Sequence, residues 1–150
     1  MSSPSKRKGQ AFESLVRSYL RQRLNDDRID RRVLHGTQDQ GDLYGIKAHG
    51  YEGIAECKNH KTITPALLED FKQQSLNERE NADADFVMLI VHKNGVGKKN
   101  VGANFCYMSL RDLLLIGSFD FGGLINDDIW VCVTLDDACR MIEGAHENSI

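Results

Sequence analysis

The apolar residues near the start of the chain recur at helical spacing. Set at 100° per residue, they form a single stripe, which predicts an amphipathic helix from Gly9 to Leu24. The stripe consists of Phe12, Leu15, Val16, Tyr19 and Leu20. Residues 1–8 show no such period and are basic and polar, so we expect a disordered basic tail there.

Shorter apolar runs predict β-strands along the rest of the chain. Strands are expected at 28–35, 42–46, 51–58, 85–92, 104–110 and 129–135. The short turn KAHG joins the second strand to the third as a hairpin. The run DFVMLIVH at 85–92 is almost wholly apolar, which is typical of a strand buried on both faces.

Capping residues mark the starts of the later helices. Thr64 is a favourable N-cap before Pro65, and together they predict a helix within 62–81. Ser109 is expected to cap a short helix, and a last helix is expected at 136–144. The elements run in the order α-β-β-β-α-β, followed by a mixed C-terminal part. This order predicts an α/β fold (α+β on a stricter reading) with a mixed central sheet flanked by helices.

Length and composition predict one globular domain over 1–150, with its main core at 9–95 and a C-terminal elaboration at 96–150. The chain is 41% hydrophobic, and a domain of this length buries about 68–70% of its unfolded surface. The four cysteines are scattered without a C-x-x-C pair, which favours a reducing cytoplasmic location and disfavours a zinc site. No apolar run reaches the length of a membrane span, so we expect no membrane partner.

Charge is distributed unevenly between the two halves of the chain. Residues 1–75 carry 13 Lys and Arg against 10 Asp and Glu, whereas residues 76–150 carry 6 against 12. The net charge of −3 argues weakly against a nucleic-acid partner, but such asymmetry argues for one. A solvated helix face with a flexible tail explains the basic excess equally well.

Two charged residues stand in the otherwise apolar segment GYEGIAECKNH (50–60). Alternation along a strand puts Glu56 and Lys58 on one face, roughly 6–7 Å apart, and turns Cys57 toward the core. The predicted hairpin brings Asp42, at the start of the preceding strand, beside Glu56. The segment therefore places two carboxylates and a lysine at one end of the sheet.

Such a group suits metal-dependent cleavage of phosphate esters. Mg²⁺ binds through one or two carboxylates and keeps several waters, and a lysine beside it can orient a water or stabilise the transition state. The alternative is an ion pair of Lys58 with Glu56 or Asp42 at the sheet edge. For an isolated E-x-K pattern the ion pair is favoured, but Asp42 across the hairpin changes the balance.

The pattern Asp42 … Glu56-Cys57-Lys58 resembles the D…E-x-K signature of the PD-(D/E)XK nuclease superfamily, in which these residues lie on adjacent strands of a hairpin. The segments KGQAFE, HGTQDQGDL, IAECKNH and FVMLIVHKNG are most similar to the Holliday-junction resolvases of archaea and phages. This resemblance covers roughly residues 8–95 and implies a restriction-endonuclease-like core. In this chain Gly41 replaces the proline before the aspartate.

The resemblance also implies the members of a catalytic site. The catalytic set is Asp42, Glu56, Lys58 and Glu13, and the metal ligands are Asp42, Glu56, Glu13 and the backbone carbonyl of Cys57. The implied cofactor is Mg²⁺, with Mn²⁺ as a substitute and no small-molecule cofactor. Glu13 lies 100° from Phe12 and borders the helical stripe. An ion pair with Arg17, four residues on, is the alternative role for Glu13.

Two accessory residues and a set of basic residues complete these expectations. Thr37 is placed near the scissile phosphate, with a turn-forming threonine as the alternative, and Gln74 shares a helix face with Leu67, Leu68 and Phe71. The expected DNA-backbone contacts are Lys6, Arg7, Lys8, Arg17, Arg21, His60, Lys61, Lys93, Lys98 and Lys99. Solvated loops explain the lysines nearly as well. The segment GVGKKN lacks the spacing of a Walker loop.

The sequence thus predicts a Mg²⁺-dependent, structure-selective DNA endonuclease, most like a Holliday-junction resolvase. A restriction or repair endonuclease of the same fold, and a non-catalytic DNA-binding module, are the alternatives. The expected partners are four-way or branched DNA and a second copy of the chain, in the cytoplasm, with a phage-encoded protein acting in its host as one case. The apolar segment 113–125 is a candidate dimer interface, with a core helix end as the alternative.

Overall fold

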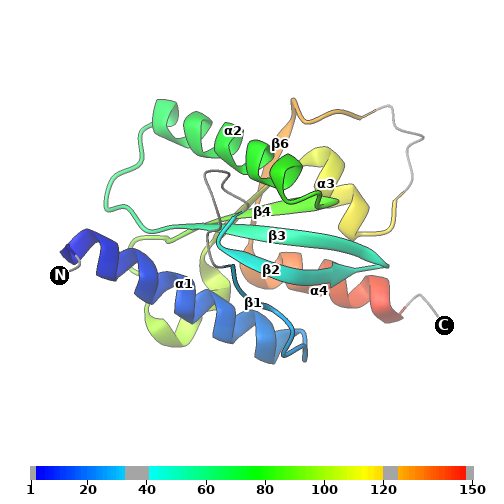
Figure 1. Cartoon of the computed structure of the whole chain (residues 1–150), viewed down its shortest axis with the longest axis horizontal. Helices are drawn as coiled ribbons and strands as arrows, with labels where there is room; N and C mark the ends of the chain where they lie inside the picture. Colours follow the sequence, from blue (N-terminus) through cyan, green and yellow to red (C-terminus); the bar gives the residue numbers. More distant parts are fainter. Residues whose placement is uncertain (1–2, 33–40, 120–124, 148–150) are drawn as a thin grey trace.

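One six-stranded mixed sheet lies between helices on its two faces (Figure 1). The structure, a computed structural model, describes residues 3–32, 41–119 and 125–147. The strands are β1 (Asp30–Arg31), β2 (Leu43–Ala48), β3 (Tyr51–Lys58), β4 (Phe86–Val91), β5 (Phe105–Ser109) and β6 (Trp130–Thr134). The helices are α1 (Pro4–Arg23), α2 (Pro65–Asn81), α3 (Leu110–Ile116), α4 (Leu135–Glu147) and the 3₁₀ helix η1 (Lys98–Ala103). The predicted fold class is confirmed.

The strands lie in chain order, β1-β2-β3-β4-β5-β6. Each neighbouring pair is antiparallel except β3 and β4, which are parallel because α2 carries the chain back across the sheet. The predicted hairpin of β2 and β3 is present, with Leu43 opposite Ala55. Of the first strand predicted at 28–35, Asp30–Arg31 form β1, and residues 33–35 lie outside the described residues.

Side-chain caps determine where the helices begin. The Ser3 hydroxyl accepts the N–H of Lys6 at 3.2 Å and Pro4 occupies the first turn, so α1 begins at Pro4. The expected disordered tail is therefore wrong for residues 4–8, which are helical. The predicted caps Thr64 and Ser109 are confirmed, since their hydroxyls accept N–H groups three residues on at 3.1 and 3.2 Å.

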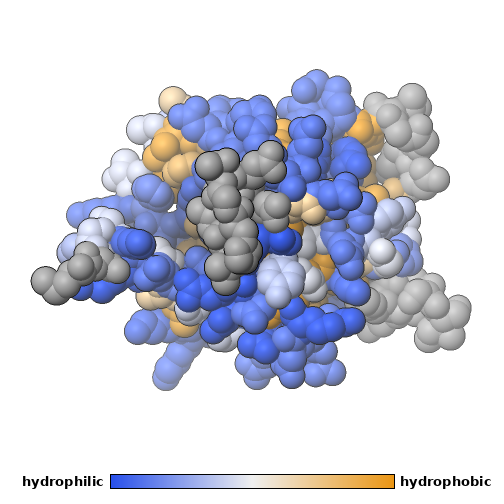
Figure 2. All heavy atoms as spheres, viewed as in Figure 1, coloured by the Kyte–Doolittle hydropathy of each residue, from blue (hydrophilic) through white to orange (hydrophobic). Residues whose placement is uncertain are grey.

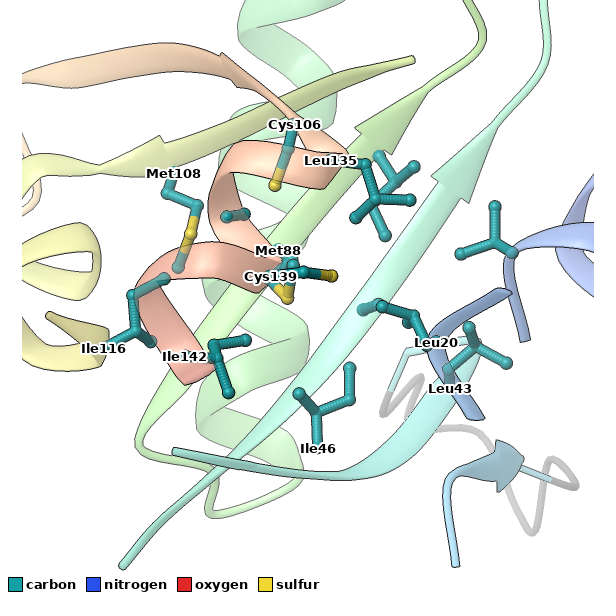
Figure 3. Packing of buried hydrophobic residues seen from close by; sticks show 14 of the residues in the cluster. Leu20, Leu43, Ile46, Met88, Cys106, Met108, Ile116, Leu135, Cys139 and Ile142 are labelled. Carbon is teal, nitrogen blue, oxygen red and sulfur yellow. The ribbon is translucent and has the colours of Figure 1, made fainter. Parts of the chain in front are cut away.

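The larger core lies between the sheet and the helices α1, α3 and α4 (Figure 3). Phe12, Val16 and Leu20 contribute the predicted stripe of α1. Leu113 and Ile116 of α3 are also buried in this core. The first part of the proposed interface segment therefore packs within one chain, and residues 120–124 of it lie outside the described residues.

The smaller core lies on the opposite face, under α2 (Figure 1). Phe71 packs there with Leu89 and Val91 of β4. Hydrophilic side chains cover most of the face seen in Figure 2. Within the described parts of the chain, no helix is long and apolar enough to cross a membrane.

Candidate active site

Asp42 is held at the beginning of β2 by hydrogen bonds to β3. Its backbone N–H donates to the Ala55 carbonyl at 3.0 Å, and its side-chain Oδ2 accepts the N–H of Cys57 at 2.8 Å. Gly41 before it adopts a φ of +91°, in the left-handed region that favours glycine and that the proline ring cannot reach. A glycine rather than a proline before Asp42 therefore has a conformational reason.

Glu56 and Lys58 lie on the α2 face of β3, as strand alternation predicts. The Glu56 side chain is 5% exposed, and the Lys58 Nζ lies 3.2 Å from its Oε1. The same Nζ lies 4.7 Å from the centre of the Phe71 ring on α2. Cys57 instead packs against the core under α1 and α4, so the predicted division of faces is confirmed. The ion pair considered from the sequence is also present.

The two carboxylates form a crowded anionic pair. Burial, and then the charge of Glu56, raise the pKa of Asp42 from 3.8 to about 8; the charge of Glu13 adds to this rise. The N–H of Cys57 and the charge of Lys58 act in the opposite direction but do not offset it. The second oxygen of Glu56, Oε2, is buried without a hydrogen-bond partner. Lys58 therefore does not offset the cost of ionising both carboxylates, and the folded protein keeps the proton of Asp42 up to about pH 8.

The carboxylate of Glu13, whose charge helps to raise the pKa of Asp42, contacts an arginine. Its Oε1 lies 2.8 Å from the Nε of Arg31, across from α1 on β1. The alternative pair with Arg17 is wrong, because Arg17 lies 3.2 Å from Asp30 instead. The charge of Glu13 thus acts on Asp42, but its carboxylate is held by a partner that the sequence did not indicate, and its role as a metal ligand remains a prediction.

The carboxylate pair has the chemistry of a Mg²⁺ site. Within the described residues there is no group of three or more His, Cys, Asp and Glu side chains placed to hold a metal. Two carboxylates are nevertheless enough for Mg²⁺, which completes its shell with water and backbone oxygens. The unpartnered Glu56 Oε2 and the repulsion that raises the pKa of Asp42 fit a divalent cation held by these two carboxylates.

The accessory residues have different outcomes. Gln74 is half-buried on the predicted face of α2, and its side-chain amide donates to the Glu78 carboxylate at 2.9 Å, one turn further on. A contact between Gln74 and the carboxylate pair therefore remains a prediction. Thr37 lies outside the described residues.

The expected DNA contacts divide into two groups. Arg17 pairs with Asp30, and Arg21 donates to the Asp27 backbone carbonyl at 2.9 Å, so both are engaged within the protein. The remaining basic side chains are exposed and, in the described part of the chain, form no ion pair. They are Lys6, Arg7, Lys8, His60, Lys61, Lys93, Lys98 and Lys99. Of these, His60 packs against the ring of Phe71 at 5.2 Å and Lys93 lies over Phe105.

Sequence reasoning missed two residues that shape the site. Arg31 holds Glu13, but the two residues lie on different elements, a strand and a helix. No pattern in the sequence around either residue indicates that they pair. Phe71 provides the aromatic face under Lys58. Its position on the buried side of α2 was predictable, whereas its contact with Lys58 depends on how α2 crosses β3.

Compared with models of protein families, with curated proteins and with solved structures, the chain matches none. The chemistry of the site therefore has to be argued from its own geometry.

Proposed function

We propose that this protein is a Mg²⁺-dependent, structure-selective DNA endonuclease of the junction-resolving kind. One observation carries the proposal: the half-buried Asp42 and the buried Glu56 share one strand end with Lys58, and the pKa of Asp42 is raised to about 8 because Lys58 does not offset its burial and the charge of Glu56. A structural ion pair needs one carboxylate per cation, and burying a surplus negative charge is costly. Such an arrangement is typical of functional sites rather than of structural ones.

Each residue of the site has a separate role in this proposal. Asp42 and Glu56 hold the metal, with the Cys57 carbonyl on the same edge of β3. A bound Mg²⁺ supplies the charge that activates a water and stabilises the phosphate in the transition state. Lys58, held over Phe71, places its ammonium beside Glu56, where it orients the water and contributes positive charge. Glu13 and Arg31 position the helix α1 against this edge.

The basic residues favour DNA as the substrate. Phosphate contacts by exposed lysines bind DNA without reading its sequence, which suits an enzyme that recognises a branch by its shape. The presence of the three residues of the D…E-x-K pattern and of the helical carboxylate Glu13 disfavours a non-catalytic module. The resemblance to junction resolvases then favours four-way DNA over linear sites.

A four-way junction is nearly two-fold symmetric, and resolving it needs nicks in two opposed strands. One chain carries the Asp42–Glu56 pair once, so we propose a two-fold homodimer that presents this pair twice. A supercoiled plasmid with an extruded cruciform distinguishes this arrangement, because a first nick releases the torsion and removes the cruciform. Linear product supports paired cutting within one complex, and nicked circles alone contradict it.

The function itself is tested with purified protein, Mg²⁺, a synthetic four-way junction and a linear duplex of matched sequence. We expect symmetric nicks in the junction and little cutting of the duplex. Equal cutting of the junction and the duplex would indicate a restriction or repair nuclease instead of a resolvase. Binding of the junction with no cutting in Mg²⁺ or Mn²⁺ would contradict an endonuclease and support a non-catalytic DNA-binding module.

A further inference from the structure

A cavity of about 250 Å³ opens beside the carboxylate site. It lies between α1, the end of β3 and η1, and its walls are mainly apolar and aromatic. Phe12, Leu15, Val96 and Val101 line it, with His92 on one side. The Phe12 and His92 rings meet edge to face with centroids 5.5 Å apart, which gives the cavity a firm aromatic wall.

The cavity lies at the carboxyl ends of the two parallel strands. Asn59, which lines it, directly follows Lys58, and the N–H of His92 donates to the Lys58 carbonyl at 2.9 Å. The carboxyl ends of parallel strands are where open α/β sheets bind ligands. A DNA strand lying across this edge can therefore reach the cavity and the carboxylates together.

The rim of the cavity is positively charged. Lys8 and Lys98 line it, and both are exposed. The segments around it, 3–12, 57–68 and 86–111, contain no Asp or Glu. The Asn94 side chain donates to the Lys61 carbonyl at 3.0 Å, which joins two of these segments. An apolar hollow in a cationic surface fits a ligand with a flat apolar part and anionic groups beside it.

Two polar side chains of the wall, Asn104 and His92, are engaged within the protein, whereas the buried Oδ1 of Asn59 has no hydrogen-bond partner in the described part of the chain. Asn104 accepts the N–H of Lys93 at 2.8 Å and donates to the Val101 carbonyl at 2.9 Å. The Nε2 of His92 lies 3.0 Å from the Val96 carbonyl. The wall thus offers mainly stacking and apolar contact, with one unpartnered acceptor at Asn59.

We propose that this cavity receives one unstacked nucleobase of the DNA, whose phosphates Lys8 and Lys98 hold outside it. This inference rests on the proposed function and adds a basis for its selectivity. The volume of the cavity lies below the roughly 300–1,000 Å³ of sites for drug-sized ligands, and this smaller volume suits a single ring system. Extruding a base costs a few kcal/mol, and least where the base is already unpaired. The cavity therefore favours branched or distorted DNA over a perfect duplex.

The test measures binding without metal, in EDTA, of a duplex with one unpaired base and of its perfectly paired counterpart. Ala11 is exposed and lines the cavity, so Ala11→Phe fills the mouth from outside the core. Ser18→Phe, at an exposed position of the same helix that does not line the cavity, is the matched control. Lys8→Gln with Lys98→Gln tests the rim.

We expect the wild-type protein and Ser18→Phe to prefer the duplex with the unpaired base. Ala11→Phe should lose about tenfold or more of this preference, since a stacked base contributes about 1–3 kcal/mol. The two lysine changes should weaken binding of both duplexes alike. Each variant should unfold at the wild-type urea midpoint.

An unchanged preference in Ala11→Phe, or no preference in the wild-type protein, would overturn the inference. Either result would leave the proposed function standing if the same protein still nicks junctions. Nicking depends on the carboxylate site, whereas the preference for an unpaired base depends on the cavity. The converse result is a wild-type protein that prefers the duplex with the unpaired base, loses this preference in Ala11→Phe, and yet cleaves no DNA. That result would support the base-binding cavity and contradict the nuclease activity.

Discussion

The side-chain Oδ2 of Asp42 accepts the backbone N–H of Cys57 at 2.8 Å. This bond ties the first carboxylate of the site to the strand that carries Glu56 and Lys58. Because backbone groups alternate along a strand, the N–H and the carbonyl of Cys57 point toward the same edge, the one where Asp42 lies. The backbone carbonyl of Cys57 is therefore on the side on which the carboxylate could share a metal with it.

The raised pKa of Asp42 predicts a characteristic dependence of stability on pH in metal-free protein. The unfolded chain loses this proton near its ordinary value of 3.8, whereas the folded protein holds it up to about pH 8. A pKa raised on folding means that stability falls as pH rises between these values. We expect the free energy of unfolding in EDTA, from urea titrations, to decline from pH 5 to pH 8.

Asp42→Asn removes this titration. The variant should show a flatter pH profile and exceed wild-type stability at pH 8 by about 1–3 kcal/mol, since one pKa unit corresponds to about 1.4 kcal/mol. Mg²⁺ should stabilise the wild-type protein at pH 8 and not the variant, because a ligand that binds only the folded state stabilises it. Asp70→Asn, at an exposed carboxylate of α2, is the control. Parallel profiles for the wild type and Asp42→Asn would contradict the crowded pair.

Lys58 and Cys57 should differ in what their removal affects, because they lie on opposite faces of β3. Lys58→Ala should lower the single-turnover cleavage rate by about 10²–10³, as expected when one preorganised positive group is removed. Cys57→Ala should cost about 1 kcal/mol of stability and leave the rate largely unchanged. Cleavage rates and urea midpoints of both variants test this. An essential Cys57 with a dispensable Lys58 would reverse the assignment.

The sequence allowed much of this site to be predicted, because its main features are local. Strand alternation places Glu56 and Lys58 together, and two strands joined by a tight turn bring Asp42 to their end. The partner of Glu13 could not be predicted in this way, since Arg31 reaches it from β1 through tertiary packing. The same holds for Lys58 over Phe71 and for the cavity beside Phe12. The start of α1 was not predicted because its capping residues, 3 and 4, lie in a basic polar segment typical of a tail.

Gly41 should be needed for the position of Asp42. An alanine there would be strained at a φ of +91°, and its Cβ would lie 3.1 Å from Cδ1 of Ile54. Gly41→Ala should lose about 1–2 kcal/mol of stability and also weaken Mg²⁺ binding. Gly95 has the same φ of +91° with open space around it, so Gly95→Ala is the matched control. Urea titrations and calorimetric Mg²⁺ titrations measure the two effects. Equal loss of Mg²⁺ affinity in both variants would contradict the role of Gly41.

The exposed lysines and the paired arginines should differ in their effect on salt dependence. Replacing Lys98 and Lys99 by glutamine should reduce the slope of log K against log salt by roughly 0.9 for each phosphate that is no longer neutralised. Replacing Arg17 by glutamine should change it less, because Arg17 already lies 3.2 Å from Asp30. Junction affinities from about 50 to 200 mM salt give these slopes. An unchanged slope in the lysine variant would mean that Lys98 and Lys99 are solvated side chains of η1 that do not contact phosphates.

In the proposed mechanism, Asp42 and Glu56 hold the metal for phosphodiester cleavage. The most direct measurement is the single-turnover rate of nicking of an end-labelled four-way junction by wild-type protein, Asp42→Asn and the control Asp70→Asn, each with Mg²⁺ and with EDTA. We predict cleavage by the wild type and Asp70→Asn in Mg²⁺ only, and none by Asp42→Asn although it binds the junction as well as the wild type. Cleavage in EDTA, or a wild-type rate for Asp42→Asn, would contradict the account.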